Sequence, residues 1–347
     1  MADLSLFDPN GVSNPDNNIF GLPFSEEESR VVLVPVPWEV TVSSGAGTSR
    51  ASDHIFKASL QVDLFDSAYN NSWQQGFYMK PIDKKLLLKS DYLRKEAELY
   101  IDYISKGNDV KANKFMCKSL KEINEGSLFM NTWVYDQTIE LLNKNKLVGL
   151  IGGDHSTPFG FIKAIGEHYE SFGILQIDAH CDLRIAFEEL KYSHASIMYN
   201  VLTEIPQVKK LVQVGIRDYG EDEYQYIQDN KDRISVFFDK DIKERQYEGD
   251  SWKTIVKEII DQLPHNVFIS FDIDGLDPKL CPNTGTPVPG GFEAQQIAYL
   301  FKCLVDSGRK LIGFDLNEVG VGENNIDANV AARQLFHLCN LLIKSNS

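Results

Sequence analysis

The alternation of short apolar runs with longer amphipathic segments constrains the fold of this chain more than any other feature. Several runs have the length and apolar character of buried strands: residues 31–37, 147–152, 172–178, 210–216, 234–238, 267–274 and 311–316. Segments with helical apolar spacing lie between most of them, at residues 159–169, 224–230, 252–263, 294–307 and 330–344. Strands and helices that alternate in this way form β-α-β units. We therefore predict an α/β fold with three layers, α/β/α, around a mainly parallel central sheet.

The length and charge of the chain limit its organisation and its partners. The chain has 347 residues without an internal repeat, which is near the upper size that one hydrophobic core supports, so we predict a single domain over residues 1–347. The formal net charge of -15 disfavours nucleic acid and anionic membranes as partners, because both would repel an acidic protein. The same charge is compatible with a cationic substrate.

Signals for export and for disulfides are lacking in the sequence. The N-terminal residues Met1-Ala-Asp-Leu-Ser-Leu lack the basic region and apolar core of a signal peptide, and no apolar run approaches the length of a membrane span. The five cysteines are scattered without C-x-x-C spacing, so they indicate neither a disulfide framework nor a thiolate zinc site. We expect a cytoplasmic enzyme.

One stretch departs from the rhythm of strands and helices. Residues 80–125 are rich in lysine and glutamate and have a helical pattern, with a break at Gly107-Asn-Asp. We predict a solvated helical insertion at the edge of the sheet. A cap over the active site and a contact between copies of the chain are the two alternatives.

Carboxylates and imidazoles gather where predicted strands end. Alternate side chains of an extended segment share a face, so the first, third and fifth residues of Asp178-Ala-His-Cys-Asp182 can converge on one point. Three further strand ends carry related motifs: Gly152-Gly-Asp-His-Ser156, Ser270-Phe-Asp-Ile-Asp-Gly-Leu-Asp-Pro278 and Phe314-Asp-Leu-Asn-Glu318. Open α/β sheets place their sites at this edge.

The candidate ligands are too numerous for one small ion. They comprise two imidazoles and four carboxylates, from His155, Asp178, His180, Asp182, Asp272 and Asp274. Oxygen and imidazole donors suit a divalent metal such as Mn²⁺, and this number suits two ions roughly 3.5–4 Å apart. Four crowded carboxylates would also repel one another without cations. The sequence therefore predicts a binuclear metal centre.

Two such ions favour hydrolysis, because they lower the pKa of a shared water to near neutrality. Enzymes that hydrolyse phosphoesters usually have arginine or lysine side chains near the metals to hold the phosphate. Here the nearest cation in the sequence is Arg184, while Glu318 is acidic and lies at another strand end. This balance favours a cationic substrate.

Together with Thr284-Gly-Thr-Pro287, these motifs resemble the ureohydrolases, the family of arginase, agmatinase and formimidoylglutamase. The resemblance runs from about residue 147 to residue 318. It implies an arginase-like fold, two Mn²⁺ ions, and assembly of the chain into trimers or hexamers. It also implies that a hydroxide bridging the metals attacks a guanidinium carbon and releases urea and an amine.

The resemblance assigns a role to each candidate residue. Asp178 and Asp272 would bridge both ions, while His155 with Asp182, and His180 with Asp274, would complete the two shells. Three residues would be catalytic, in that Asp182 would accept a hydrogen bond from the hydroxide, His194 would shuttle a proton, and Glu318 would pair with the guanidinium. Thr286 and His194 would also contact the substrate.

The substrate is less narrowly predicted than the chemistry. Arg184 followed by Tyr192-Ser-His-Ala-Ser196 is closest to agmatinase-like members, which convert agmatine to putrescine and urea. The alternative is a guanidine hydrolase that forms urea and ammonia and favours Ni²⁺, followed by an arginase or a formimidoylglutamase. A catalytically silent metal-binding scaffold is the alternative from another class.

Overall fold

The central sheet carries the whole architecture. The computed structural model describes residues 4–5, 7–43, 45–69 and 71–347, and in this part of the chain eight parallel strands form one sheet with the order β2-β1-β3-β8-β7-β4-β5-β6. The strands are β1 (Val31–Pro35), β2 (Phe77–Met79), β3 (Leu147–Ile151), β4 (Phe172–Ile177), β5 (Val208–Ile216), β6 (Ile234–Phe238), β7 (Asn266–Asp272) and β8 (Lys310–Asn317). The predicted parallel α/β sheet is thereby confirmed.

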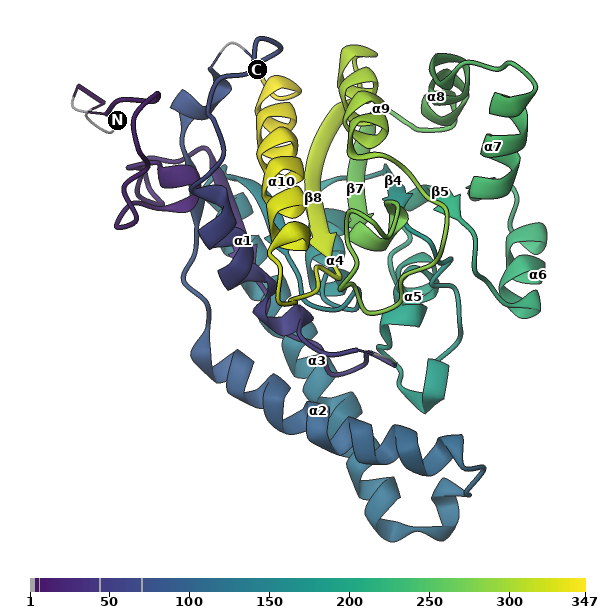
Figure 1. The fold of residues 1–347 in the computed structure, drawn as a ribbon. Helices are drawn as coiled ribbons and strands as arrows, with labels where there is room; N and C mark the ends of the chain where they lie inside the picture. The colour runs from purple at the N-terminus through teal and green to yellow at the C-terminus, as the bar shows by residue number, and fades with distance from the viewer. Residues whose placement is uncertain (1–3, 6, 44, 70) are drawn as a thin grey trace.

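Helices cover both faces of this sheet (Figure 1). Their bounds are α1 (Ala51–Ser59), α2 (Lys84–Ser105), α3 (Lys114–Asn143), α4 (Phe159–His168), α5 (Ile197–Glu204), α6 (Glu221–Asp229), α7 (Asp239–Tyr247), α8 (Trp252–Asp261), α9 (Ala294–Asp306) and α10 (Ile326–Lys344). One hydrophobic core joins the sheet to α1, α8, α9 and α10, and a second joins the opposite face to α2, α3, α4 and α5. The three layers follow from these two cores.

The strands are apolar on both sides because each side chain enters one of the two cores. In β1, Leu33 packs in the core with α1 and α10, while its neighbours Val32 and Val34 pack in the other core. A strand covered on both faces has no solvated side, so its sequence reads as a continuous apolar run. This is why the strand runs could be recognised without an alternating pattern.

The elements that sequence reasoning missed are short or polar. β2 has three residues and lies at the edge of the sheet, too short for a readable pattern. α1, α5 and α7 were also not predicted, and α7, with the sequence DKDIKERQY, presents little apolar surface. α10 begins at Ile326, four residues before the predicted start.

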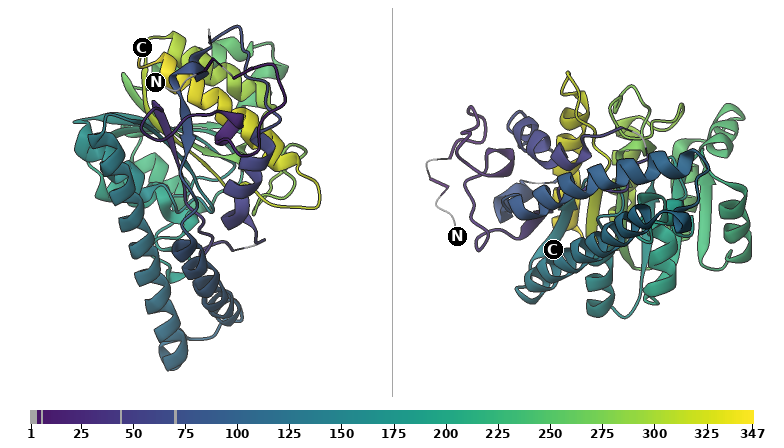
Figure 2. Two further views of the ribbon diagram at one scale, coloured as in Figure 1. Left: turned by 90° about the vertical axis from the view of Figure 1, so that its left-hand side faces the viewer. Right: turned by 90° about the horizontal axis from the view of Figure 1, so that it is seen from below.

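The predicted insertion is a helical hairpin. α2 begins after Asp83, whose side chain caps the first turn, and α3 begins after Asn113, which does the same. α3 continues beyond the predicted end at residue 125 and packs against α4. Figure 2 shows the two helices running side by side away from the sheet, on the side toward which β8 points in Figure 1. In the described ranges no helix is long and apolar enough to cross a membrane.

Two glycines allow the hairpin helices to pack closely, and they predict different costs of substitution. A Cβ on Gly160 of α4 would lie 2.1 Å from the Asn131 carbonyl oxygen of α3, which is backbone and cannot move alone. A Cβ on Gly126 of α3 would meet only the Leu93 side chain, whose end can rotate. We expect Gly160→Ala to lower the free energy of unfolding by about 1–3 kcal/mol. Gly126→Ala should change it by less than about 1 kcal/mol, because the gain in helix propensity offsets the contact.

Chemical denaturation of both variants measures this difference. Equal losses of stability in the two variants would contradict the close packing of α3 on α4.

Candidate metal centre

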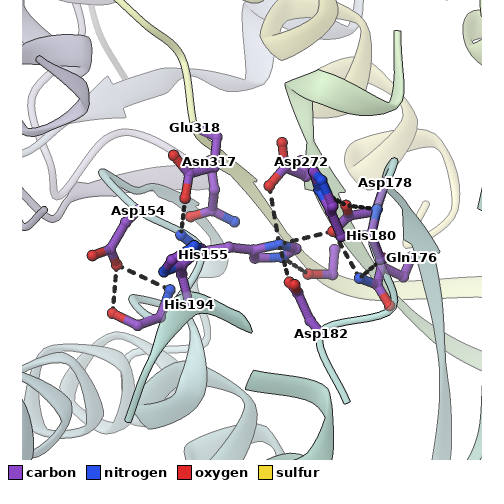
Figure 3. A network of polar contacts seen from close by, with 12 residues as sticks. Asp154, His155, Gln176, Asp178, His180, Asp182, His194, Asp272, Asn317 and Glu318 are labelled. Atoms are coloured by element: carbon purple, nitrogen blue, oxygen red, sulfur yellow. Dashed lines mark hydrogen bonds and ion pairs between the residues drawn. The ribbon is translucent and has the colours of Figure 1, made fainter. Parts of the chain in front are cut away.

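The predicted ligands come from strands that are neighbours in the sheet. β3, β8, β7 and β4 are consecutive in the strand order, and all run in the same direction. Their carboxyl ends therefore share one edge, although His155 and Glu318 are far apart in the sequence. The structure brings all six predicted ligands to this edge, and Figure 3 shows most of them around the His155 ring.

His155 points one ring nitrogen into a group of carboxylates. Its Nδ1 lies 3.1 Å from an oxygen of Asp178, 3.1 Å from one of Asp182 and 3.2 Å from one of Asp272. All four side chains are buried. A ring nitrogen carries at most one proton, which cannot serve three carboxylates, whereas one cation at this point can.

The other ring nitrogen of His155 has a defined partner. Nε2 lies 2.9 Å from the Ser270 hydroxyl, which donates its own proton to Asp315 at 3.0 Å. The hydroxyl must then accept a hydrogen bond from the Nε2–H of His155. In the neutral ring this leaves a lone pair on Nδ1, directed at the carboxylates. Metal-binding histidines are commonly oriented by such a hydrogen bond from their second nitrogen.

A second group of candidate ligands shares Asp178 with the first. The Nδ1 atom of His180 lies 3.0 Å from Asp274 and 3.6 Å from Asp178. The donor atoms of Asp178, His180 and Asp274 all lie within 4.8 Å of one another, as do those of His155, Asp178 and Asp182. A shared carboxylate between two donor sets is the arrangement that two adjacent cations require.

The pKa values of the cluster indicate an excess of negative charge. Burial, together with Asp178, raises the pKa of Asp182 to about 7, and burial together with Asp274 raises the pKa of Asp272 well above its ordinary value. Burial would lower the pKa of His180, but Asp274 and Asp178 raise it to about 12. Without a cation, the protein must hold protons in this cluster. Divalent ions would replace them, so the donor set fits two metals.

Polar side chains within the strands fix the orientation of the carboxylates. Gln176 donates to Asp178 at 2.8 Å and accepts from Gln213 at 2.6 Å. Asp315 accepts hydrogen bonds from Ser270 and from Asn317, which is 2.5 Å away. Sequence reasoning did not assign this orienting role to these residues. A signal was present, since each is a polar residue within an otherwise apolar run.

A cavity of about 200 Å³ opens beside the cluster. Its lining includes predicted metal ligands as well as His194, Thr286 and Glu318, which the resemblance assigned to the substrate. The complete lining comprises Ser43, His180, Asp182, Arg184, Phe187, His194, Ala195, Asp218, Glu223, Asp272, Thr286 and Glu318. The cavity thus borders part of the predicted metal cluster and the residues predicted to bind the substrate.

Glu318 lines this cavity, and only one of its two carboxylate oxygens has a hydrogen-bond partner among the described residues. Its Oε1 accepts from the His155 backbone N–H at 2.9 Å, while Oε2 is buried without a hydrogen-bond partner among the described residues. Burial and the neighbouring Asp154 raise the pKa of Glu318 well above its ordinary value. Glu318 also has a left-handed φ of 59°, as Asp182 has one of 54°. Such strained residues commonly lie at functional sites.

His194 also lines the cavity. Its backbone N–H donates to the Thr41 hydroxyl at 3.0 Å, and Thr41 in turn donates to Asp154 at 2.9 Å. The Nδ1 atom of His194 is buried without a partner in the part of the chain that the structure describes, and burial lowers the pKa of its ring. Thr286 donates to Asp274 at 3.4 Å. Sequence reasoning did not identify the connection through Thr41.

Comparison with known proteins agrees with the motifs. The model of the arginase family matches residues 29–339. An N(1)-aminopropylagmatine ureohydrolase of Thermus thermophilus is 28% identical over 316 residues, 91% of this chain and 91% of that protein. The agmatinase of Halalkalibacterium halodurans is 24% identical over 294 residues, 84% of each chain.

Solved structures support the fold. The proclavaminate amidino hydrolase of Streptomyces clavuligerus superimposes with a TM-score of 0.71 at 19% identity, over 97% of this chain and 100% of that one. The agmatine ureohydrolase of Thermoplasma volcanium gives a TM-score of 0.69 at 20% identity, over 98% and 96%. The family match covers most of the chain, and it confirms the resemblance that the strand-end motifs predicted. The chain therefore belongs to the arginase family, whose members are hydrolases that act on amidino C–N bonds.

Proposed function

We propose that this protein is a binuclear metal hydrolase that releases urea from a small cationic guanidino compound of the agmatine type. The observation that carries the proposal is a buried carboxylate oxygen of Glu318 that has no hydrogen-bond partner among the described residues. Glu318 lines the same cavity as part of the cluster of histidines and aspartates. A buried carboxylate without a partner is costly unless a cation pairs with it. A planar guanidinium can pair with a carboxylate through two parallel hydrogen bonds.

The metals would be held by the six residues of the cluster. Asp178 and Asp272 would be shared, with His155 and Asp182 on one ion and His180 and Asp274 on the other. Two divalent ions bound there would supply a water nucleophile that is activated at neutral pH. The oxygen-rich donor set favours Mn²⁺, with Ni²⁺ as the alternative.

The residues of the cavity would then position the substrate and move protons. Glu318 would hold the guanidinium, and the Thr286 hydroxyl, which also lines the cavity, would hydrogen-bond it. Asp182 would accept a proton from the attacking water as the water oxygen adds to the guanidinium carbon. His194, whose ring is neutral at pH 7, would carry a proton between solvent and the leaving amine as the C–N bond breaks.

The names of the relatives agree with a guanidino substrate, since aminopropylagmatine and agmatine both carry this group. Free guanidine is a second candidate, and Arg184 is the observation that favours it. This arginine lines the cavity and pairs with Glu223 at 3.4 Å, so it engages a carboxylate that could otherwise hold the second positive charge of agmatine, which guanidine lacks. Assembly into trimers or hexamers and a cytoplasmic location are parts of the proposal that rest on the sequence and the family resemblance.

Metal removal should make the stability of the protein depend on pH. In the metal-free native state, His180 has a pKa of about 12 and Asp182 one of about 7, both above their values in the unfolded chain. Between pH 6.5 and 8 the native state therefore binds more protons than the unfolded state, so the free energy of unfolding should fall as pH rises. The slope is about 1.4 kcal/mol per pH unit for each proton retained.

Denaturation with and without a chelator, at pH 6.5 and pH 8, measures this effect. The metal-loaded protein should lack the fall, because its ligands are already deprotonated. Identical pH dependence of the two forms would count against a metal centre at this cluster.

Asp274→Asn should reduce the number of bound ions from two to one, because a neutral amide replaces a charged ligand of one ion. Metal analysis of the purified variant measures the stoichiometry. Asp277→Asn is the matched control, since Asp277 lies in the same motif and contacts Lys279 instead of the cluster. Retention of two ions by Asp274→Asn would rule out its role as a ligand.

Urea release should be assayed with agmatine, guanidine, arginine and guanidinobutyrate, and formamide release with formiminoglutamate, after loading with Mn²⁺ or Ni²⁺. We expect turnover of agmatine or guanidine. Glu318→Gln should lower kcat/KM by about 100-fold or more with two ions retained, because the buried charge that pairs with the substrate is lost. Absence of urea release from every compound would refute the proposed function.

A further inference from the structure

The helical hairpin α2–α3 contacts two loops that border the cavity. The first, which we call the β1 loop, comprises residues 36–43 and contributes Ser43 to the cavity lining. The second, the β4 loop, comprises residues 183–193 and contributes Arg184 and Phe187. The hairpin therefore lies behind the outer wall of the cavity without lining the cavity itself.

Arg94 of α2 connects the helix to the β1 loop. Its side chain is only 12% exposed, and its Nη1 donates a hydrogen bond to the carbonyl oxygen of Val42, the residue before Ser43. Its Nε pairs with Glu98 at 3.1 Å, one turn further along α2. The guanidinium is thus held by its own helix while it holds the loop. Ser90 of the same helix accepts a further hydrogen bond from the Glu39 backbone N–H at 3.1 Å.

The charge of Arg94 also acts on the β4 loop. Burial raises the pKa of Glu188, and the positive charges of Arg94 and Arg184 oppose this shift. Glu188 therefore lies within the electrostatic reach of both guanidinium groups. Its Oε2 is buried and has no hydrogen-bond partner among the described residues, so these charges are its main compensation.

The β4 loop has a strained backbone that needs external support. Ala186, Glu188 and Glu189 have φ values of 43°, 57° and 61°, in the left-handed region that residues with a Cβ avoid. Such conformations persist only where the surroundings determine them. α3 supplies part of this support, because Asn124 accepts from the Lys191 N–H at 2.7 Å and donates to the Glu189 carbonyl at 3.4 Å.

The two loops also meet each other at the cavity. The Thr41 hydroxyl of the β1 loop accepts from the backbone N–H of His194, the residue that follows the β4 loop. The two loops are thus hydrogen-bonded to the hairpin, and near the cavity the β1 loop is hydrogen-bonded to the residue that follows the β4 loop. A shift of either loop would move the wall that faces the metal cluster.

We propose that Arg94 is a positioning residue, which holds the β1 loop against the hairpin while Asn124 holds the β4 loop, and which thereby shapes the outer wall of the substrate cavity. The inference rests on the proposed function, because it assigns this cavity to the substrate. It gives the insertion a role in substrate binding through the loops, without contact between the hairpin and the substrate.

Arg94→Gln tests the inference in the metal-loaded protein. Loss of the charge and of the bond to Val42 should raise KM for the turned-over guanidino compound by about 10-fold or more, with a smaller change in kcat and two ions retained. Arg94→Lys keeps the charge and should give an intermediate KM. Lys118→Gln, an exposed lysine of α3 whose side chain is 71% exposed, is the matched control and should leave KM unchanged.

Hydrogen exchange gives a second measurement that needs no substrate. Backbone amides of residues 36–43 should exchange faster in Arg94→Gln than in the unchanged protein, while those of β7 and β8 should not. If Arg94→Gln does not fold, Asn124→Ala should speed exchange in residues 189–191 in the same way.

The outcomes separate the two proposals. Unchanged exchange in residues 36–43, or unchanged KM in a folded Arg94→Gln protein, would overturn the role of Arg94. If no guanidino compound is turned over, the proposed function fails, and faster exchange would still support the attachment of the loops to the hairpin.

Discussion

The crowding of like charges at one edge of the sheet is the constraint on which the rest of the site depends. Four aspartates and Glu318 lie buried at the carboxyl ends of neighbouring strands, and burial together with mutual repulsion raises the pKa of several of them. Uncharged polar groups within the strands, such as Gln176 and Ser270, orient the candidate ligands but do not neutralise their negative charge. Bound protons or metal cations must therefore balance the charge of the cluster. The cluster, the polar layer beneath it and the cavity above it therefore form one electrostatic unit.

Much of this could be read from the sequence, for a physical reason. The strands are buried on both faces, so their apolar runs stand out, and the ligands follow immediately where these runs end. The motif Gly152-Gly-Asp-His-Ser156 and the acidic strand ends resemble those of one enzyme family, and the family match confirms that the chain belongs to it. Local signals of this kind survive without knowledge of the tertiary structure.

The parts that could not be predicted depend on contacts between distant segments. β2 is defined by its pairing with β1 rather than by its own three residues. Thr41 becomes part of the site because Asp154 and His194 both reach its hydroxyl from other loops. The hairpin was predicted as helical, yet its relation to the cavity depends on Arg94 and Asn124, which in the sequence look like ordinary polar residues of a solvated helix. The spacing of residues along the sequence carries no information on such contacts between distant segments.

The strand order has a consequence for how the site comes into being. β8, the last strand of the chain, lies between β3 and β7, so it separates His155 from the ligands that follow β4 and β7. Until β8 is inserted, the two halves of the ligand set have no common sheet edge. A chain emerging from the ribosome can therefore form β1 to β6 without forming a metal site. Binding of both ions would be possible only after almost the entire chain has been made, so a fully loaded centre would stabilise finished molecules and discriminate against truncated ones.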